Sequence, residues 1–306
     1  MNKFLNYFLS CILVLASCFI QAQQSKIDSL ITFLKTAKED TSKINAQNIL
    51  SKLYSNIGSY EPSIKFAQEA LQKSEKLGYK KGAGAAYLNI GVIDFSKGNY
   101  DAALDVFQKA LKIMEDIGDK KGISKCLNNS GLIYLSEGNY EKALDNFLKS
   151  FKIKEETGDK PGIGMAYLNI GNVYMNQGNN DKALEFYTKS LQINRELGNK
   201  MFEATNLNNI GIICVYKGKS EEALEYYIKA LKIREEIGDK NGIAMSYGNI
   251  GISYYDKGDY VRSLENQLKS AKINIEIGNK EGVAVCYTNV GNVYMKQKNM
   301  KSLFII

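Results

Sequence analysis

Few side chains in this 306-residue sequence could carry out chemistry. The chain contains no histidine, which removes the commonest general base and the commonest metal ligand. The adjacent carboxylates Glu155 and Glu156 could support acid–base catalysis, but such pairs recur at the end of an amphipathic segment and are interpreted as solvated surface. Gly162-Ile-Gly164 resembles a phosphate loop only faintly, because no strand precedes it and the third glycine is absent. We therefore expect no catalytic residue, no cofactor and no metal ion.

One polar residue does recur at a fixed spacing, an asparagine every 40 residues. Its six copies are Asn89, Asn129, Asn169, Asn209, Asn249 and Asn289. Asparagine is a middling-to-poor residue inside a helix, so six such copies need a cause. Two interpretations are open, and they can coexist. The side chains could hydrogen-bond to a neighbouring helix, or they could form a ladder that bonds the backbone of an extended ligand.

The elements that carry these asparagines are predicted to be helices. From Leu207 to Cys214 the apolar residues follow the spacing i, i+3, i+4, i+7, which indicates one helical stripe that ends at Gly218. A second helix is expected over 221–237, ending at Gly238. Two helices and two short turns account for the period. A fixed period of this size is typical of stacked supersecondary units, and we expect helix pairs near 84–97 and 100–117, repeated every 40 residues.

The marks within one period form a recognisable pattern. Counted from Gly164 as position 1, they are Tyr167, Ile170, Gly171, Tyr174, Ala183, Tyr187 and Ser190 at positions 4, 7, 8, 11, 20, 24 and 27. This pattern resembles the tetratricopeptide repeat, and the resemblance extends from Ile44 to about Lys298. The small residues Gly171 and Ala183 are expected to let the paired helices approach closely. The period is 40 rather than about 34 residues, as in the long repeats of kinesin light chains and of bacterial sensor arrays.

The resemblance implies an all-α fold, a right-handed α-solenoid of about six and a half stacked antiparallel helix pairs. The predicted organisation is a signal peptide at 1–22, an N-terminal capping helix at 23–43, a repeat array at 44–298 and a truncated tail at 299–306. Units are expected to start near residues 44, 84, 124, 164, 204, 244 and 284.

In the resembled family, the first helix of each pair lines a concave groove that holds peptides. The residues that the resemblance places there are Asn89, Asn129, Leu132, Leu168, Asn169, Asn172, Met175, Asn209, Ile212, Asn249, Ile252 and Asn289. The residues at position 5 are apolar, small or uncharged, so an apolar or mixed peptide is favoured. The net charge of +7 is modest, and acidic residues lie among the lysines. Nucleic acid is therefore not an expected partner.

The cysteines are not expected to be reactive. Cys126 and Cys286 lie four repeats apart, too far for a disulfide, whose Cα atoms must lie within about 7 Å. Both occupy a position that is Ala in sister repeats, and Cys214 occupies the tyrosine position. We interpret all three as buried small hydrophobic residues.

The two ends depart from the repeat pattern. A positive start, an apolar run from Phe8 to Ile20 and a small residue at Ala22 are typical of a secretory signal peptide, with the mature chain beginning at Gln23. Lipid attachment at Cys18 and an uncleaved membrane anchor are the alternatives. At the other end the seventh unit has a first helix, but the chain stops where the second should begin, after Met300. This leaves an apolar face that favours end-to-end self-association.

The leading interpretation is an exported, periplasmic or secreted, non-enzymatic scaffold that binds a protein or peptide, with membrane association possible only through the N-terminal segment. The alternative is the sensor region of a longer bacterial signalling protein, whose kinase, cyclase or transcription-regulating output domain is missing. An enzyme acting on its own is the least favoured of the three. The sequence does not identify the ligand.

Overall fold

The computed structural model describes residues 24–303, and the side chains of residues 24–298. All regular structure in the described part of the chain is helical, which confirms the predicted all-α solenoid of antiparallel helix pairs. The chain divides into two compact units, Met1–Asp159 and Lys160–Ile306, which are described separately. The predicted signal segment at 1–22 lies outside the described residues, and no described helix is long and apolar enough to cross a bilayer.

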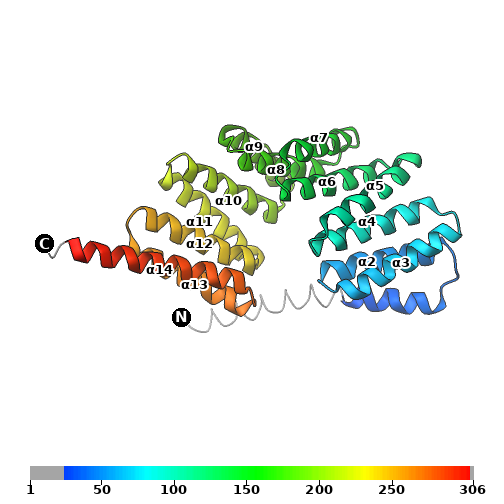
Figure 1. Cartoon of the computed structure of the whole chain (residues 1–306), viewed down its shortest axis with the longest axis horizontal. Coiled ribbons are helices and arrows are strands. Elements are labelled where there is room, and N and C mark those ends of the chain that lie inside the picture. Colours follow the sequence, from blue (N-terminus) through cyan, green and yellow to red (C-terminus); the bar gives the residue numbers. More distant parts are fainter. Residues whose placement is uncertain (1–23, 304–306) are drawn as a thin grey trace. The chain divides into compact units, whose positions relative to one another are not determined.

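The first unit opens with a helix over residues 24–36 and continues with three helix pairs (Figure 1). These are α2 (Thr41–Asn56), α3 (Tyr60–Lys76), α4 (Lys80–Ser96), α5 (Tyr100–Asp116), α6 (Lys120–Ser136) and α7 (Tyr140–Glu156). Each helix packs on the next. In addition α2 touches α4, and α4 touches α6, as expected for stacked helix pairs. The opening helix buries Ile27 and half-buries Leu30, Ile31 and Leu34, the amphipathic stripe expected of a capping helix.

The second unit has the same construction with seven helices among its described residues (Figure 1). They are α8 (Lys160–Asn176), α9 (Asn180–Glu196), α10 (Lys200–Tyr216), α11 (Ser220–Ile237), α12 (Lys240–Asp256), α13 (Tyr260–Glu276) and α14 (Lys280–Leu303). Successive helices pack against each other, and α8 with α10 and α12 with α14 also touch.

One turn geometry separates the successive helices from α2 to α14. A glycine with φ between 62° and 79° stands at every twentieth position from Gly58 to Gly278. This left-handed conformation suits glycine because it has no Cβ. The residue after the glycine can cap the next helix, and the Asp239 carboxylate accepts the Gly242 backbone N–H at 2.9 Å. The first helices therefore begin at residues such as Lys80, four residues earlier than predicted.

A second set of glycines, inside the first helices, sets how closely the pairs approach. A Cβ added at Gly171 would lie 2.7 Å from the Tyr187 ring, and one at Gly131 would lie 2.7 Å from the Phe147 ring. Both rings are fully buried. The position-8 glycine thus accommodates the position-24 aromatic ring, while the expected small residue Ala183 is also buried in the core of the second unit.

The last helix runs past the point where a turn was expected. α14 continues to Leu303, so the prediction that a first helix ends near 297 is wrong. The sequence gives the physical reason. Each of the other first helices is followed by a glycine with positive φ, and the equivalent residue after α14 would be Lys298. A lysine disfavours that conformation. The face that a second helix would cover is open, and Tyr287 and Tyr294 are 53% and 58% exposed.

Candidate functional site

The asparagines that recur every 40 residues, from Asn89 to Asn289, form a column, and some of them connect neighbouring first helices. Asn89 Nδ2 donates to the Asn48 backbone oxygen at 2.9 Å, and Asn249 Nδ2 donates to Asn208 Oδ1 at 2.9 Å. Asn209 Nδ2 donates more weakly to Asn172 Oδ1, at 3.4 Å. These bonds confirm the first of the two interpretations for these three copies, a hydrogen bond to the neighbouring helix.

The remaining copies differ in their surroundings. Asn289 Nδ2 donates to Gln267 Oε1 at 3.4 Å, on the preceding second helix rather than a first helix. Asn169 is buried, and Asn129 is half-buried. A ladder that binds a ligand backbone stays a prediction for the column.

Several of the other predicted groove residues take part in internal packing. Leu168 is 6% exposed and belongs to the core of the second unit, and Met175 and Ile212 pack against that core. The Tyr187 hydroxyl donates to Asn172 Oδ1 at 2.8 Å. Leu132, in the first unit, is half-buried. These side chains offer a ligand less surface than their helical positions alone suggested.

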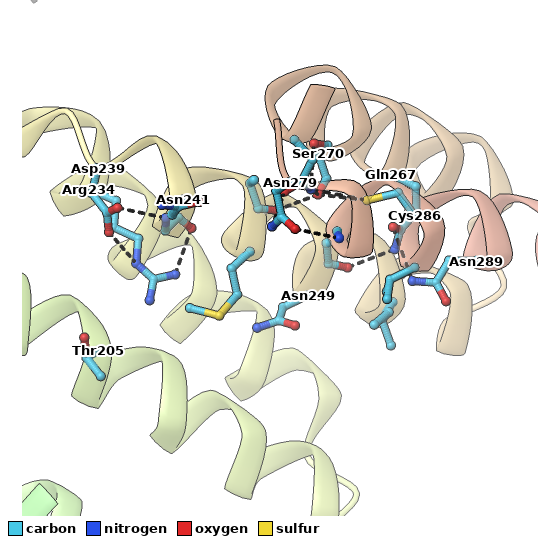
Figure 2. Close-up of a pocket in the computed structure, with 18 residues that line it drawn as sticks. Thr205, Arg234, Asp239, Asn241, Asn249, Gln267, Ser270, Asn279, Cys286 and Asn289 are labelled. Atoms are coloured by element: carbon cyan, nitrogen blue, oxygen red, sulfur yellow. Dashed lines mark hydrogen bonds and ion pairs between the residues drawn. The ribbon is translucent and has the colours of Figure 1, made fainter. Parts of the chain in front are cut away.

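The structure instead gathers part of the predicted set around one hollow of about 510 Å³ in the second unit (Figure 2). Asn249 and Ile252 of α12 and Asn289 of α14 line it, with α13 between these two helices in the sequence. The further lining residues are Thr205, Arg234, Asp239, Asn241, Gly242, Ala244, Met245, Gly248, Gln267, Ser270, Asn274, Asn279, Gly282, Val285 and Cys286.

The lining combines carboxamides with exposed apolar side chains. The carboxamides are those of Asn241, Asn249, Gln267, Asn274, Asn279 and Asn289. The apolar side chains of Met245, Ile252 and Val285 are 47%, 40% and 59% exposed. A carboxamide offers both donors and an acceptor, as a peptide group does. An apolar hollow with a few convergent polar groups is the usual form of a binding site.

A glycine leaves open space at one point of the hollow. Gly248 occupies position 5, where sister repeats carry Leu88 or Leu168. A Cβ built at Gly248 would meet only Ser270 Oγ, at 3.7 Å. The sequence shows the glycine at position 5. Whether it leaves a hollow depends on the space between α12 and α14, which the repeat pattern does not predict.

A buried arginine fixes one wall of the hollow. Arg234 is 2% exposed, and its Nη1 donates to the Gly242 carbonyl oxygen at 2.9 Å and to Ser246 Oγ at 2.8 Å. Its Nε lies 4.0 Å from Asp239 Oδ2. Burial lowers the pKa of the guanidinium, and the Asp239 carboxylate opposes this. Sequence reasoning missed Arg234, although a polar residue at the same position of sister repeats, such as Asn194 and Asn274, was an available signal.

The cysteines behave as predicted where the structure describes them. Cys126, Cys214 and Cys286 are free and buried. Burial raises the pKa of the Cys126 thiol to about 12 and also raises that of Cys214. Among the described residues no group of His, Cys, Asp and Glu could hold a metal ion.

Comparison with known proteins supports the repeat assignment. The family model described as "Tetratricopeptide repeat" matches residues 82–156 and 162–236. No curated protein matches the chain.

Solved structures share the fold. A signal transduction ATPase with numerous domains (STAND) from Pyrococcus horikoshii, which has a tetratricopeptide repeat sensor, superposes with a TM-score of 0.68 and 20% identity over 88% of this chain. The chain spans only 43% of that protein's length. The apo quorum sensor NprR from B. thuringiensis gives a TM-score of 0.66 at 17% identity, covering 96% of this chain and 81% of NprR. A Rap protein complexed with Competence and Sporulation Factor gives a TM-score of 0.64 at 14% identity, covering 93% of this chain and 90% of the Rap protein.

Proposed function

Because the chain belongs to the tetratricopeptide repeat proteins, we propose that it is a non-enzymatic scaffold that binds a polypeptide segment in the hollow between α12 and α14. The observation that carries this proposal is the pairing of carboxamides with exposed apolar side chains around one opening. The similar Rap structure is a complex with Competence and Sporulation Factor, which agrees with a ligand-binding role for this fold.

The lining favours an extended segment with at least one small or medium apolar side chain. Asn249 of α12 and Asn289 of α14 both line the space (Figure 2), where carboxamides can pair with the N–H and C=O groups of a ligand backbone. Ile252 and Val285 offer apolar contact, and the space above Gly248 accepts a side chain. Arg234 is already bonded and close to Asp239, so a strongly charged ligand side chain is not required.

The experiment is a selection of random peptides on the immobilised full chain, followed by calorimetry with the selected sequences. Gly248→Leu restores the side chain of sister repeats and should fill the hollow with little strain. We expect this substitution to lower the affinity for the selected peptides at least about tenfold, because it fills the space that their apolar side chain would occupy. Gly291→Leu is the matched control, since a Cβ there meets nothing within 4 Å. Equal affinity for Gly248→Leu and the unaltered chain would refute the site.

Export is part of the proposal and has its own test. The pattern of residues 1–22 supports cleavage before Gln23, and lipid attachment at Cys18 is the alternative. Expression in a bacterium followed by N-terminal sequencing of the mature chain distinguishes them. An intact Met1 in the cytosolic fraction would contradict export.

A second candidate function is the sensor region of a signalling protein. The similarity to a STAND protein with a tetratricopeptide repeat sensor, of which this chain spans 43%, supports it. The genomic reading frame beyond codon 306 tests it, since this candidate requires an output domain encoded in continuous frame.

A further inference from the structure

The exposed face of α13 carries an apolar stripe made of Val261, Leu268 and Ile275. These residues are spaced seven apart, at positions 18, 25 and 32 of the repeat, and they are 65%, 51% and 58% exposed. Seven residues make almost two helical turns, so the three side chains lie along one side of the helix over about 20 Å. A contiguous exposed stripe of this kind marks an interaction surface.

The other second helices do not carry the stripe. Position 18 is acidic in each of them, from Glu61 of α3 to Glu221 of α11. The exposure of this face does not depend on which helices follow. Ile228 occupies position 25 of α11, and it is 48% exposed although α12 and α13 come after it in the stack. Packing between repeats therefore does not require apolar side chains on this face of α13.

Two charged side chains lie beside the stripe and differ from their equivalents elsewhere. In α5, α7, α9 and α11 the acidic residue at the position of Glu265 forms an ion pair with the lysine four residues on. The lysine four residues after Glu265 is Lys269, which lies over the Tyr247 ring, 5.5 Å from its centroid. Among the described residues, neither Glu265 nor the exposed Lys272 has an ion-pair partner.

We propose that α13 pairs antiparallel with α13 of a second copy of this chain, about a two-fold axis at Leu268. A two-fold axis at this point sets Leu268 against its own copy. It also sets Val261 of each chain against Ile275 of the other, because these residues lie equally far from Leu268 in opposite directions. The stripe therefore meets itself along its whole length.

The two charges beside the stripe decide the direction of the pairing. Glu265 lies three residues before Leu268 and Lys272 lies four residues after it, on the same side of the stripe. An antiparallel two-fold pairing brings that side of both helices together, so Glu265 of each copy is level with Lys272 of the other and two ion pairs form. A parallel two-fold pairing places the charged sides of the two helices away from each other and forms neither ion pair.

A lipid surface fits the stripe less well than a second copy. Helices that lie in a membrane interface carry an excess of lysine and arginine on their polar face, whereas Glu265 and Lys272 balance each other. One helix face from each copy makes a small interface, so we expect a weak dimer that depends on concentration. The α13 residues that line the hollow, Gln267, Ser270 and Asn274, are buried on another side of the helix, so the dimer keeps both hollows open.

The test is sedimentation equilibrium of the full chain across the micromolar range, where we expect a monomer–dimer equilibrium. Leu268→Glu sets like charges against each other at the axis and should raise the dissociation constant at least about tenfold. Ile228→Glu is the matched control. It places the same charge at the equivalent exposed position of α11 and should leave the dissociation constant unchanged. Circular dichroism of each variant checks that helical content is intact.

An exchange of the two charges tests the direction of the pairing. Glu265→Lys and Lys272→Glu should each raise the dissociation constant at least about threefold, because each replaces two attractions by two repulsions. The doubly substituted chain should dimerise as the unaltered chain does, since both ion pairs form again with their signs exchanged.

Four results would overturn the proposal. They are a chain that is monomeric throughout the range, a dimer that Leu268→Glu leaves intact, a doubly substituted chain that does not regain the dimer, and a dimer that Tyr294→Glu of α14 dissociates. In the last case the copies would meet end to end and not through α13.

Discussion

Alanine at two equivalent glycines should have opposite effects on stability. Gly171 and Gly291 both occupy position 8 of a first helix. Either substitution gains about 1 kcal/mol of helix propensity. At Gly171 the new methyl would lie 2.7 Å from the Tyr187 ring, which is fully buried and held by its bond to Asn172. Overpacking of this kind costs about 1–3 kcal/mol. At Gly291 a Cβ meets nothing within 4 Å, so only the gain remains.

The gain in helix propensity is common to both variants. The difference between their free energies of unfolding therefore measures the clash of the new methyl with the Tyr187 ring, and it should be about 1–3 kcal/mol. Repeat proteins couple mainly to nearest neighbours, and a single unfolding midpoint can mislead. Urea melts followed by circular dichroism should therefore be joined to hydrogen exchange resolved by helix. We expect faster exchange in α8 and α9 for Gly171→Ala and slower exchange in α14 for Gly291→Ala. Equal stabilisation by both would refute the packing argument.

Three further outcomes follow from the geometry. Asn172→Ala should cost about 1–3 kcal/mol by removing the acceptor of the Tyr187 hydroxyl at 2.8 Å and leaving it only the weaker acceptor Met175 Sδ at 3.4 Å, whereas adding Tyr187→Phe to it should recover most of that loss in a double-mutant cycle of urea melts. The contribution of Cys126 to stability should be constant below pH 9 and be lost above it, because the folded pKa of its thiol is raised to about 12 from an ordinary 9.0, and Cys126→Ala should make the alkaline fall in stability less steep. Gly248→Ala should raise stability by about 1 kcal/mol, since its Cβ meets only ordinary contact; a destabilised variant in thermal melts would contradict this.

The fold could be predicted from the sequence because the pattern repeats. Residues such as Gly171 and Tyr187 recur together at fixed spacing, and a helix pair can bury its apolar stripe only by stacking on its neighbours. The helix starts were placed four residues late, because hydrophobic periodicity locates the middle of a helix better than its cap. At Lys80 the helix already begins two residues after the turn glycine.

The candidate site was predicted only in part. Periodicity placed Asn249, Ile252 and Asn289 on one predicted groove face, and these three residues line the same hollow. It could not distinguish them from Leu168, which points the same way along its helix but is buried. The difference depends on what the adjacent repeat contributes, and therefore on packing between helices rather than on spacing within one. Arg234 was missed for a different reason, because the polar residues at the same position of sister repeats were a signal in the sequence that was not used.

The likeness of α8 and α14 has a consequence for folding. The unfolded chain contains two segments, Gly171–Met175 and Gly291–Met295, that present the same surface to α9. While the array assembles, α9 can pair with either, and only the short turn at Gly178 gives α8 the advantage of proximity. Pairing with α14 would enclose the intervening helices in a closed loop and stall assembly as a register error.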